Sequence, residues 1–317
     1  MRVDNAQLAA FAEAIREGSF ELAARKLNVT PSAISQRIRL LEERMGQVLI
    51  QRSAPCQVTA AGRPLLRYAE ELSLLEAEVF SALGVVDGGA TSAVRIPMVI
   101  NADSLDSWFL EVFDALGAST ATTLDLRVED QDHSVVLLRE GTVMAGVSAS
   151  ARPIQGCRVE PLGVMRYLAL ASPSYVERHF LAGVNAESLN AAPMLTFNKK
   201  DALQQVFLGR LTDAAIKPPT HYLPTTRSFG EAVLRGMAWG MIPEQLAEGH
   251  LKTGQLVELA PQHWLDVPLF WHRWRIASAA LDALTRLVRQ AASKALRASP
   301  GAQGSRPSES VVVPDGR

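Results

Sequence analysis

The stretch that decides the fold is residues 19–43, SFELAARKLNVTPSAISQRIRLLEE. Its first part carries Ala23, Ala24 and Leu27, whose small or apolar side chains let a second helix approach closely. The helical pattern stops at Asn28-Val29, where a turn is expected. The spacing therefore predicts a short helix followed by a turn.

A second helix is predicted to begin directly after that turn. Thr30 suits its N-cap, and Pro31 suits the first helical position, where a missing N–H loses no intrahelical partner. Apolar residues then recur at steps of three and four, which predicts one buried stripe along the helix. The stripe consists of Ile34, Ile38, Leu41 and Met45. The opposite face is polar and cationic, so the whole stretch is typical of a helix-turn-helix.

Such a face suits the major groove of DNA, because Gln and Arg read base edges and Ser reaches phosphate oxygens. The plain alternative is a solvated amphipathic helix pair with no ligand. We expect DNA contacts from Thr30, Pro31, Ser32, Ser35, Gln36, Arg37, Arg39 and Arg52. Within that set, Arg52 and Arg37 are expected to meet phosphates.

The flanks of this motif strengthen the DNA-binding interpretation. A preceding helix is predicted from the stripe Leu8, Phe11, Ala12 and Ile15, which gives a three-helix core. Residues 48–59, VLIQRSAPCQVT, contain two short β-type runs about a Ser-Ala-Pro turn. These runs predict a wing that carries Arg52.

Residues 60–83 predict a long helix that a small domain does not need for its own core. At 1.5 Å per residue it would be roughly 35 Å long. Its apolar stripe consists of Leu65, Ala69, Leu72, Leu75, Val79 and Leu83. Antiparallel pairing with a second copy would bury this stripe, so we expect a dimer that presents two reading helices.

At this point the chain resembles the LysR-type transcriptional regulators. The amino-terminal pattern of that family is matched by Ser19-Phe20, Ala23-Ala24, Leu27, Ala33, Ser35, Ile38, Leu41 and Glu42. Within the family the chain is similar to the ArgP/LysG group, which responds to basic amino acids. This similarity rests on residues 101–104, 128–130, 146–148, 241–243 and 271–273. The resemblance spans about residues 4 to 295.

Composition bounds the classes of partner. The formal net charge of the 317 residues is only −1, so attraction to nucleic acid must be local. Residues 16–52 supply a modest local excess, with seven Lys or Arg against four Asp or Glu.

The first twenty residues carry Asp4, Glu13, Arg16 and Glu17 and lack an apolar segment, so we expect no signal peptide, no membrane anchor and a cytoplasmic protein. Cys56 and Cys157 are isolated and are expected to be free thiols, with no metal and no cofactor.

The second part of the chain predicts two α/β lobes, similar to the effector domain of the family and to periplasmic solute receptors. We expect a winged helix-turn-helix at 1–59, a linker helix at 60–86, a hinge at 87–93, lobe I at 94–163 and 266–298, lobe II at 164–265, and a disordered tail at 299–317. Strands are predicted at 94–100, 124–128, 145–147, 167–171, 194–197, 221–225, 238–242 and 269–271. Helices are predicted at 104–116, 135–140 and 278–296.

Ligands of open α/β sheets bind beyond the carboxyl ends of strands, which places residues 101–104 first as an effector site. There Ser104 suits a carboxylate, whereas Asp103, Glu129 and Asp130 offer acids to cationic groups. Alternatively, Asp103 or Ser104 only caps the next helix, and Glu129 and Asp130 are solvated loop acids. The complete candidate set is Asn101, Asp103, Ser104, Glu129, Asp130, Ser148, Thr226, Ser228, Phe229 and Met241.

An enzyme finds little support in the sequence. The run 146–150, GVSAS, misses the nucleophile-elbow pattern at its last position, and there is neither a GxxxxGK[ST] nor a GxGxxG loop. A plain amino-acid receptor would explain residues 94–298 but not the first 84.

The resemblance thus implies a regulator that senses lysine, arginine or histidine and controls an exporter gene. Its expected partners are an operator DNA, further copies of itself as dimer or tetramer, and RNA polymerase. The alternative is a LysR-type regulator that answers to an unrelated metabolite.

Overall fold

The computed structural model describes residues 3–84, 86–87, 90–91, 93–117, 122–129 and 131–298. The chain forms two compact units. Unit 1 contains Met1–Ile100, Ala115–Glu160 and Trp271–Arg286, and unit 2 contains Asn101–Asp114, Pro161–Phe270 and Leu287–Arg317. In the described part of the chain, no helix combines the length and apolar character that crossing a membrane requires.

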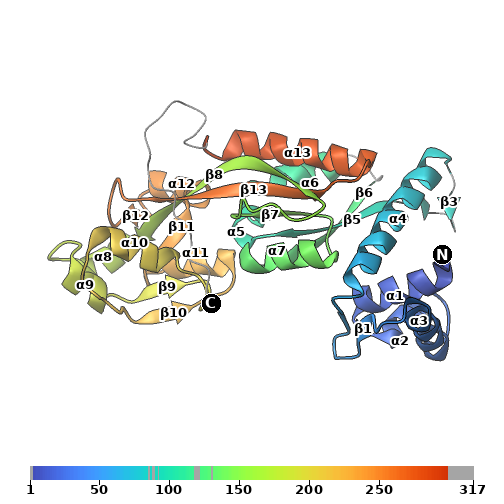
Figure 1. The fold of residues 1–317 in the computed structure, drawn as a ribbon. Coiled ribbons are helices and arrows are strands. Elements are labelled where there is room, and N and C mark those ends of the chain that lie inside the picture. Colours follow the sequence, from blue (N-terminus) through green and yellow to red (C-terminus); the bar gives the residue numbers. More distant parts are fainter. Residues whose placement is uncertain are drawn as a thin grey trace. The chain divides into compact units, whose positions relative to one another are not determined.

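The reading head at the start of unit 1 has three helices and a two-stranded wing (Figure 1). These elements are α1 (Asn5–Glu17), α2 (Phe20–Lys26), α3 (Pro31–Met45), β1 (Ile50–Gln51) and β2 (Gln57–Val58). Each helix begins at a side-chain cap, since Asp4, Ser19 and Thr30 accept hydrogen bonds from backbone N–H groups of the first turn. The predicted helix-turn-helix and wing are therefore confirmed.

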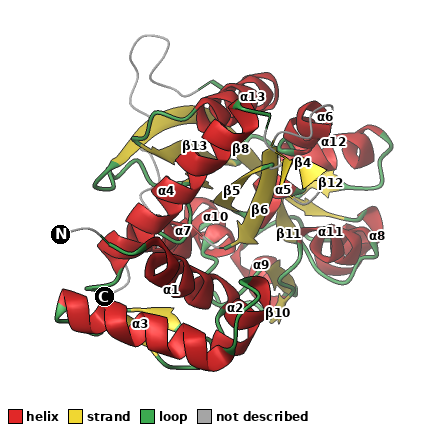
Figure 2. Ribbon diagram, turned by 90° about the vertical axis from the view of Figure 1, so that its right-hand side faces the viewer, coloured by secondary structure: helices red, strands yellow, loops and turns green. Residues whose placement is uncertain are grey.

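The core of the head is apolar and well sealed. Phe11, Ile34, Ile38 and Leu41 are fully buried between the helices. The turn between α2 and α3 contains Asn28 at φ 53°, a left-handed conformation that Asn tolerates better than most residues. Figure 2 shows α1, α2 and α3 lying against one another in this head.

The linker helix α4 (Arg63–Ala82) starts three residues later than predicted, because Thr59 to Gly62 form a turn that joins it to the wing. Gly62 lies against the wing so tightly that a Cβ there would be 2.4 Å from the carbonyl oxygen of Leu49. The predicted apolar stripe of α4 divides in two. Its first half, Leu65, Ala69 and Leu72, packs on the head core, whereas Leu75, Val79 and Leu83 are exposed.

The sheet of unit 1 is built on β5 (Val94–Ile100), which pairs in parallel with β6 (Thr122–Val128) and β7 (Ala145–Ser148). Helix α7 (Gln131–Glu140) connects β6 to β7, which confirms the predicted βαβ pattern. The predicted hinge falls partly on β3 (Val86–Asp87) and β4 (Ala90–Thr91), which pair antiparallel, so those positions are extended. Residues 88, 89 and 92 of the hinge, and the tail from 299, lie outside the described residues.

Unit 2 has a mixed arrangement of strands covered by short helices. Its helices are α5 (Ala102–Leu105), α6 (Leu110–Gly117), α8 (Pro173–His179), α9 (Ala186–Ala191), α10 (Leu203–Leu211), α11 (Thr226–Leu234) and α12 (Glu244–Lys252). Its strands are β9 (Met194–Thr196), β10 (Thr220–Tyr222), β11 (Gly240–Pro243) and β12 (Val257–Glu258). Three further elements, β8 (Cys157–Ala171), β13 (Leu265–Trp274) and α13 (Ala279–Ala295), run from one unit into the other, as does α6.

Within unit 2, β8 pairs antiparallel with β11 and β12, and β9 pairs in parallel with β10. A core of Leu170, Leu195, Val233, Ala238 and their neighbours holds these elements together.

Several predicted elements were wrong in extent, among them the strand expected at 269–271, which is β13, and two others differ for reasons that the structure makes plain. The single helix expected at 104–116 is broken into α5 and α6, because the turn at 106–109 buries the consecutive rings of Trp108 and Phe109. The strand expected at 167–171 begins ten residues earlier, at Cys157. Pro161 and Gly163 are read as turn signals in a sequence, yet here they lie inside β8.

Candidate functional site

Helix α3 exposes most of the face that the sequence assigns to DNA. Ser32, Gln36 and Arg39 are exposed, and Ser35 and Arg37 are half-buried. The side chain of Thr30 is engaged in capping, because its hydroxyl accepts from the N–H of Ala33 at 3.2 Å. Ser32, Ser35, Gln36 and Arg39 therefore share one side of α3, as groove reading requires, whereas Arg37 lies off that side and Arg52 belongs to the wing.

Arg39 has a single partner on this face, Glu43, whose carboxylate lies 2.8 Å from its Nε. Both side chains are more than half exposed, at 76% and 55%. Such a surface pair contributes only about 0–1 kcal/mol, so the guanidinium can be drawn away by a base or a phosphate at small cost.

The wing places Arg52 next to the reading helices. Its guanidinium carbon lies 5.3 Å from the centroid of the Phe20 ring, a cation–π contact that limits the rotamers of an exposed arginine. The backbone N–H of Cys56 in the same wing donates to the carbonyl of Gly18 at 2.8 Å, which ties the wing to the end of α1. Helix α3 and the wing, the two elements that are predicted to contact DNA, therefore belong to the same reading head.

A second candidate site is a cavity of about 360 Å³ in unit 2, a size typical of small-molecule sites. Its apolar walls come from Leu110, Phe197, Leu203, Phe229, Leu234, Met241, Ile242, Pro243, Leu246 and Leu256. Its charged groups are the four acids Asp103, Asp106, Asp201 and Glu231, with Arg227 and His250 as the basic side chains. The excess of carboxylates favours a cationic ligand with an apolar stem.

Asp103 is the acid of this cavity that accepts from two side-chain hydroxyl groups. The hydroxyl of Tyr167 donates to its Oδ2 at 2.8 Å, and that of Thr226 donates to its Oδ1 at 2.9 Å. Burial raises the pKa of Asp103, while these two hydrogen bonds oppose the rise because they stabilise the carboxylate. Each carboxylate oxygen retains a lone pair, so Asp103 can still accept from a ligand.

Asp201 is a second acid of the lining that is held by hydrogen bonds. Its carboxylate accepts from the N–H groups of Phe197 and Leu203, both at 3.0 Å, and so closes the loop between β9 and α10. Asp201, Asp106, Glu231 and Tyr167 were not predicted as site residues. Loop acids and a strand tyrosine carry no local signal of function, and only the tertiary fold of unit 2 brings them to one cavity or to its acid Asp103.

Four of the predicted effector residues line or border this cavity, namely Asp103, Thr226, Phe229 and Met241. Ser228 is on the same helix as Thr226 but is exposed and outside the lining. The capping alternative for Asp103 and Ser104 is wrong, because both lie inside α5 and the N-cap position is Asn101. Asn101 itself makes no side-chain capping bond.

The remaining predicted effector residues belong to unit 1 or are undescribed. Glu129 is exposed after β6, and Asp130 lies outside the described residues. Ser148 is fully buried, and its hydroxyl lies 3.0 Å from Nε2 of His272, which is also 2.8 Å from the carbonyl oxygen of Ser150. The pair resembles a nucleophile and its base, but both side chains are inaccessible, and Trp271 and Trp274 pack beside His272 in β13 as buried core residues.

Comparison with protein families matches both parts of the chain. Residues 6–63 match the bacterial regulatory helix-turn-helix protein model of the LysR family. Residues 112–293 match the LysR substrate binding domain. The two matched segments contain the reading head and most of the elements around the cavity.

Two curated relatives cover nearly the whole chain. The transcriptional regulator LysG of Mycobacterium tuberculosis is 46% identical over 292 residues, 92% of this chain and 94% of the relative. The lysine export transcriptional regulatory protein LysG of Corynebacterium glutamicum is 39% identical over 92% of this chain and 98% of its own length. Both are regulators of transcription, a class that acts by binding.

Solved structures agree with these relatives. ArgP from Mycobacterium tuberculosis superimposes with a TM-score of 0.81 at 45% identity, covering 94% of this chain and 100% of that one. Full-length LysG from Corynebacterium glutamicum, solved with the bound effector arginine, gives a TM-score of 0.74 at 38% identity and covers 93% and 99% of the two chains. With its winged helix-turn-helix and its two-lobed α/β domain, this chain belongs to the LysR family of bacterial transcriptional regulators and is of the LysG/ArgP type.

Proposed function

We propose that this regulator senses a basic amino acid, lysine, arginine or histidine, in the cavity of unit 2 and controls transcription of an amino-acid exporter gene. The observation that carries the proposal is the anchored carboxylate of Asp103 among three further acids in one partly apolar cavity. The relatives support it, since LysG of Corynebacterium glutamicum is named for lysine export and the solved structure of LysG from that organism holds arginine as its effector.

The charges of the cavity fit a cationic side chain better than a neutral one. Asp103 is fixed by two hydroxyl donors, so it need not reorganise when an ammonium or guanidinium group arrives. The aliphatic stem of lysine or arginine would lie along the apolar walls that Phe229, Met241 and Leu246 provide.

An amino acid also carries a carboxylate, which needs hydrogen-bond donors. Ser104, Thr196 and Gln204 are buried, and their side chains have atoms without a hydrogen-bond partner among the described residues. Each directly neighbours a cavity-lining residue in the sequence. A buried amide or hydroxyl without a partner is costly, so these donors suit the carboxylate or a water that accompanies it.

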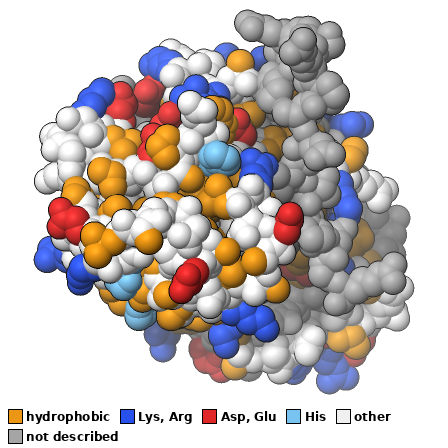
Figure 3. All heavy atoms as spheres, turned by 90° about the vertical axis from the view of Figure 1, so that its left-hand side faces the viewer, with side chains coloured by type: hydrophobic (Ala, Val, Ile, Leu, Met, Phe, Trp, Pro, Cys, Tyr) orange, Lys and Arg blue, Asp and Glu red, His pale blue; other side chains and the backbone are white. Residues whose placement is uncertain are grey.

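The reading head is proposed to bind the operator through the exposed face of α3, with Arg52 on phosphate. The exposed stripe Leu75, Val79 and Leu83 of α4 is proposed to pair with that of a second copy, because large apolar side chains are otherwise left in water. On the face of unit 2 that Figure 3 shows, hydrophobic side chains are interspersed with charged ones of both signs. That mixture agrees with DNA attraction being confined to the head. We further propose tetramers, contact with RNA polymerase and a location in the cytoplasm, where bacterial operators are found.

Calorimetric titration with matched ligand pairs tests the effector. Lysine is compared with norleucine, which keeps the stem and lacks the charge, and arginine is compared with citrulline. We expect binding of the cationic member of at least one pair and little heat from its neutral analogue. Equal affinity for both members, or no binding of lysine, arginine or histidine, would instead favour a LysR-type regulator of an unrelated metabolite.

Asp103→Asn provides the site-directed test, with Asp213→Asn as the matched control. Asp213 is an exposed acid of unit 2 that does not line the cavity. Loss of affinity in the first variant alone would place the cation at Asp103. Unchanged affinity in both would remove this cavity as the effector site.

A further inference from the structure

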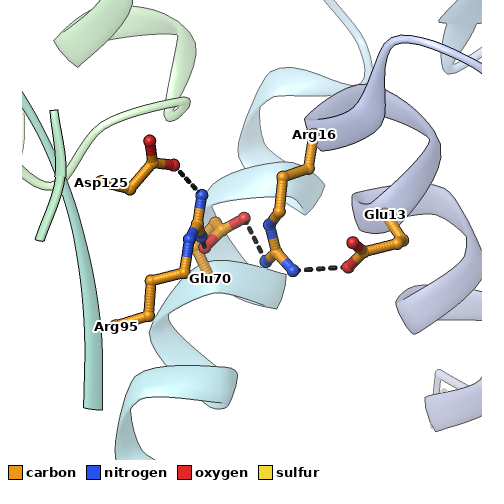
Figure 4. Close-up of polar contacts among 5 residues, drawn as sticks. All are labelled: Glu13, Arg16, Glu70, Arg95 and Asp125. Carbon is orange, nitrogen blue, oxygen red and sulfur yellow. Dashed lines mark hydrogen bonds and ion pairs between the residues drawn. The ribbon is translucent and has the colours of Figure 1, made fainter. Parts of the chain in front are cut away.

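Five charged side chains of alternating sign form one continuous chain through unit 1 (Figure 4). We call Glu13, Arg16, Glu70, Arg95 and Asp125 the ionic chain. Glu13 and Arg16 belong to α1 of the reading head, Glu70 belongs to the linker helix α4, and Arg95 and Asp125 belong to β5 and β6 of the effector lobe. The chain therefore spans three parts of the molecule that have separate roles.

Glu70 is the junction of the ionic chain. Its Oε1 accepts from Nη2 of Arg16 at 2.8 Å, and its Oε2 lies 3.7 Å from Nη1 of Arg95. Arg16 also donates to Glu13, and Arg95 donates to Asp125. One carboxylate is thus shared by a guanidinium from the head and a guanidinium from the lobe.

The burial of this junction makes its pairing obligatory. The side chains of Glu70 and Glu13 are only 7% and 6% exposed. Burial raises the pKa of Glu13 despite the neighbouring Arg16. Burial also works against the charge of Arg16, but Glu70 and Glu13 more than offset it, so the pKa of Arg16 is raised and its charge retained. A buried carboxylate that loses either guanidinium is left partly uncompensated.

Other contacts hold α4 to the lobe without reaching the head. Arg63 pairs with Glu140 at 2.9 Å, and Arg67 donates to the carbonyl oxygen of Gly156 at 2.8 Å. The ring of Trp274 lies under the guanidinium of Arg67 at 4.7 Å. These contacts offer matched controls, because they fix the same helix to the same lobe but share no group with α1.

We propose that Glu70 and Arg95 are positioning residues that couple the orientation of the reading head to the state of the effector lobe. Apolar packing between the head and α4 is tolerant of small rotations, whereas a carboxylate shared by two guanidinium groups satisfies both only in one arrangement. A change of β5 or β6 that moves Arg95 away from Glu70 frees Glu70 to pair with Arg16 alone. The reading head can then take a second orientation relative to α4. Linkage between the DNA-binding site and the effector site requires two such states.

The decisive experiment measures operator affinity with and without saturating lysine, together with calorimetric lysine affinity, for the full-length protein. This part rests on the proposed amino-acid response. For Arg95→Met we expect lysine affinity within about twofold of the parent. The ratio of operator affinity with lysine to operator affinity without lysine should, however, be at least about fivefold closer to one than in the parent. Arg95→Lys keeps the positive charge and should recover part of the ratio.

Arg63→Met is the matched control, because it removes a pairing of α4 with the lobe that does not reach the head. It should leave the ratio of operator affinities unchanged. An equal loss of the ratio in Arg63→Met and Arg95→Met would mean that general docking of α4, rather than the ionic chain, carries the effect. A normal ratio in Arg95→Met would overturn the proposal outright.

A second measurement needs no effector and so separates failure of this proposal from failure of the proposed function. Hydrogen exchange of α1 amides is compared between the parent, Arg95→Met and Arg63→Met in the ligand-free protein. Faster exchange in α1 on changing Arg95, a residue of β5, supports the ionic chain even if no basic amino acid binds. Unchanged exchange in α1 would contradict it.

Discussion

The hydroxyl of Thr226 donates to Oδ1 of Asp103 at 2.9 Å, so the first residue of α11 is hydrogen-bonded to an acid of α5. With Tyr167 on the other oxygen, the acid is held from two further elements of unit 2. These hydrogen bonds fix the carboxylate of Asp103 in the cavity, so it can orient the cationic group of a ligand.

Replacement of Asp103 by Asn is expected to weaken lysine or arginine binding by roughly 10- to 100-fold, because a hydrogen bond to a charged group contributes about 1.5–3 kcal/mol. The raised pKa of Asp103 adds a pH dependence. Affinity should be constant around neutral pH and should fall as pH decreases through that pKa, because the protonated acid carries no charge. Calorimetry at several pH values checks this, and the Asn variant should lack the acidic decline.

Arg39→Ala is expected to weaken operator binding by about 1–3 kcal/mol if the guanidinium reads a base edge. If it contacts phosphate instead, the loss should be similar for all sequences and the salt slope should fall by about one. Glu43→Ala removes the partner of Arg39 and should leave binding equal or tighter. Fluorescence anisotropy with operator and scrambled duplexes measures both, and a matching loss of effector affinity would argue against separable sites.

Val79→Asp is expected to dissociate the dimer that we propose, because it places a charge in the exposed apolar half of α4. Sedimentation velocity should show a shift toward monomer with an unchanged far-ultraviolet spectrum. Glu76→Gln, at an exposed position of the same helix, is the control and should keep the parental state. A dimer that persists in Val79→Asp would mean that another surface holds the copies together.

His272 should make the fold sensitive to mild acid. Burial lowers its pKa below the ordinary value of 6.5, so the native state binds fewer protons than the unfolded chain in that range. The free energy of unfolding should therefore fall as pH drops from about 6.5 toward the pKa of folded His272. Above about pH 6.5, His272 should have no effect on it. Thermal unfolding of His272→Gln between about pH 5 and 8 should show a weaker pH dependence, whereas His221→Gln, at an exposed site, should follow the parent.

Local patterns predicted the reading head well. The cap at Thr30 and the stripe Ile34, Ile38 and Leu41 are encoded within a few residues, and the structure has them as predicted. Strand β5 was predicted at its true bounds for the same reason, since a short apolar run specifies a buried strand without help from elsewhere.

Long-range features escaped prediction. The meeting of Arg16 with Glu70, 54 positions apart, follows from tertiary packing that no spacing rule contains. The place of Gly163 inside β8 also depends on distant residues, because a Cβ there would lie 2.8 Å from the carbonyl oxygen of Arg297, and its φ of 140° suits glycine. Asp103, a candidate from the sequence, lines the cavity, whereas its partner Tyr167 has the sequence pattern of an ordinary strand residue.

The closeness of Gly62 to the wing has a mechanical consequence. A side chain there would collide with the carbonyl of Leu49 and with the Val58 side chain, so wing and linker helix meet with no room between them. This close contact keeps the wing and the start of α4 together, so a change in the orientation of the head is a rotation about Gly62 rather than a separation of the head from α4. Such a rotation displaces Arg52 of the wing, and one added methyl group at position 62 would change the angle between the wing and α4.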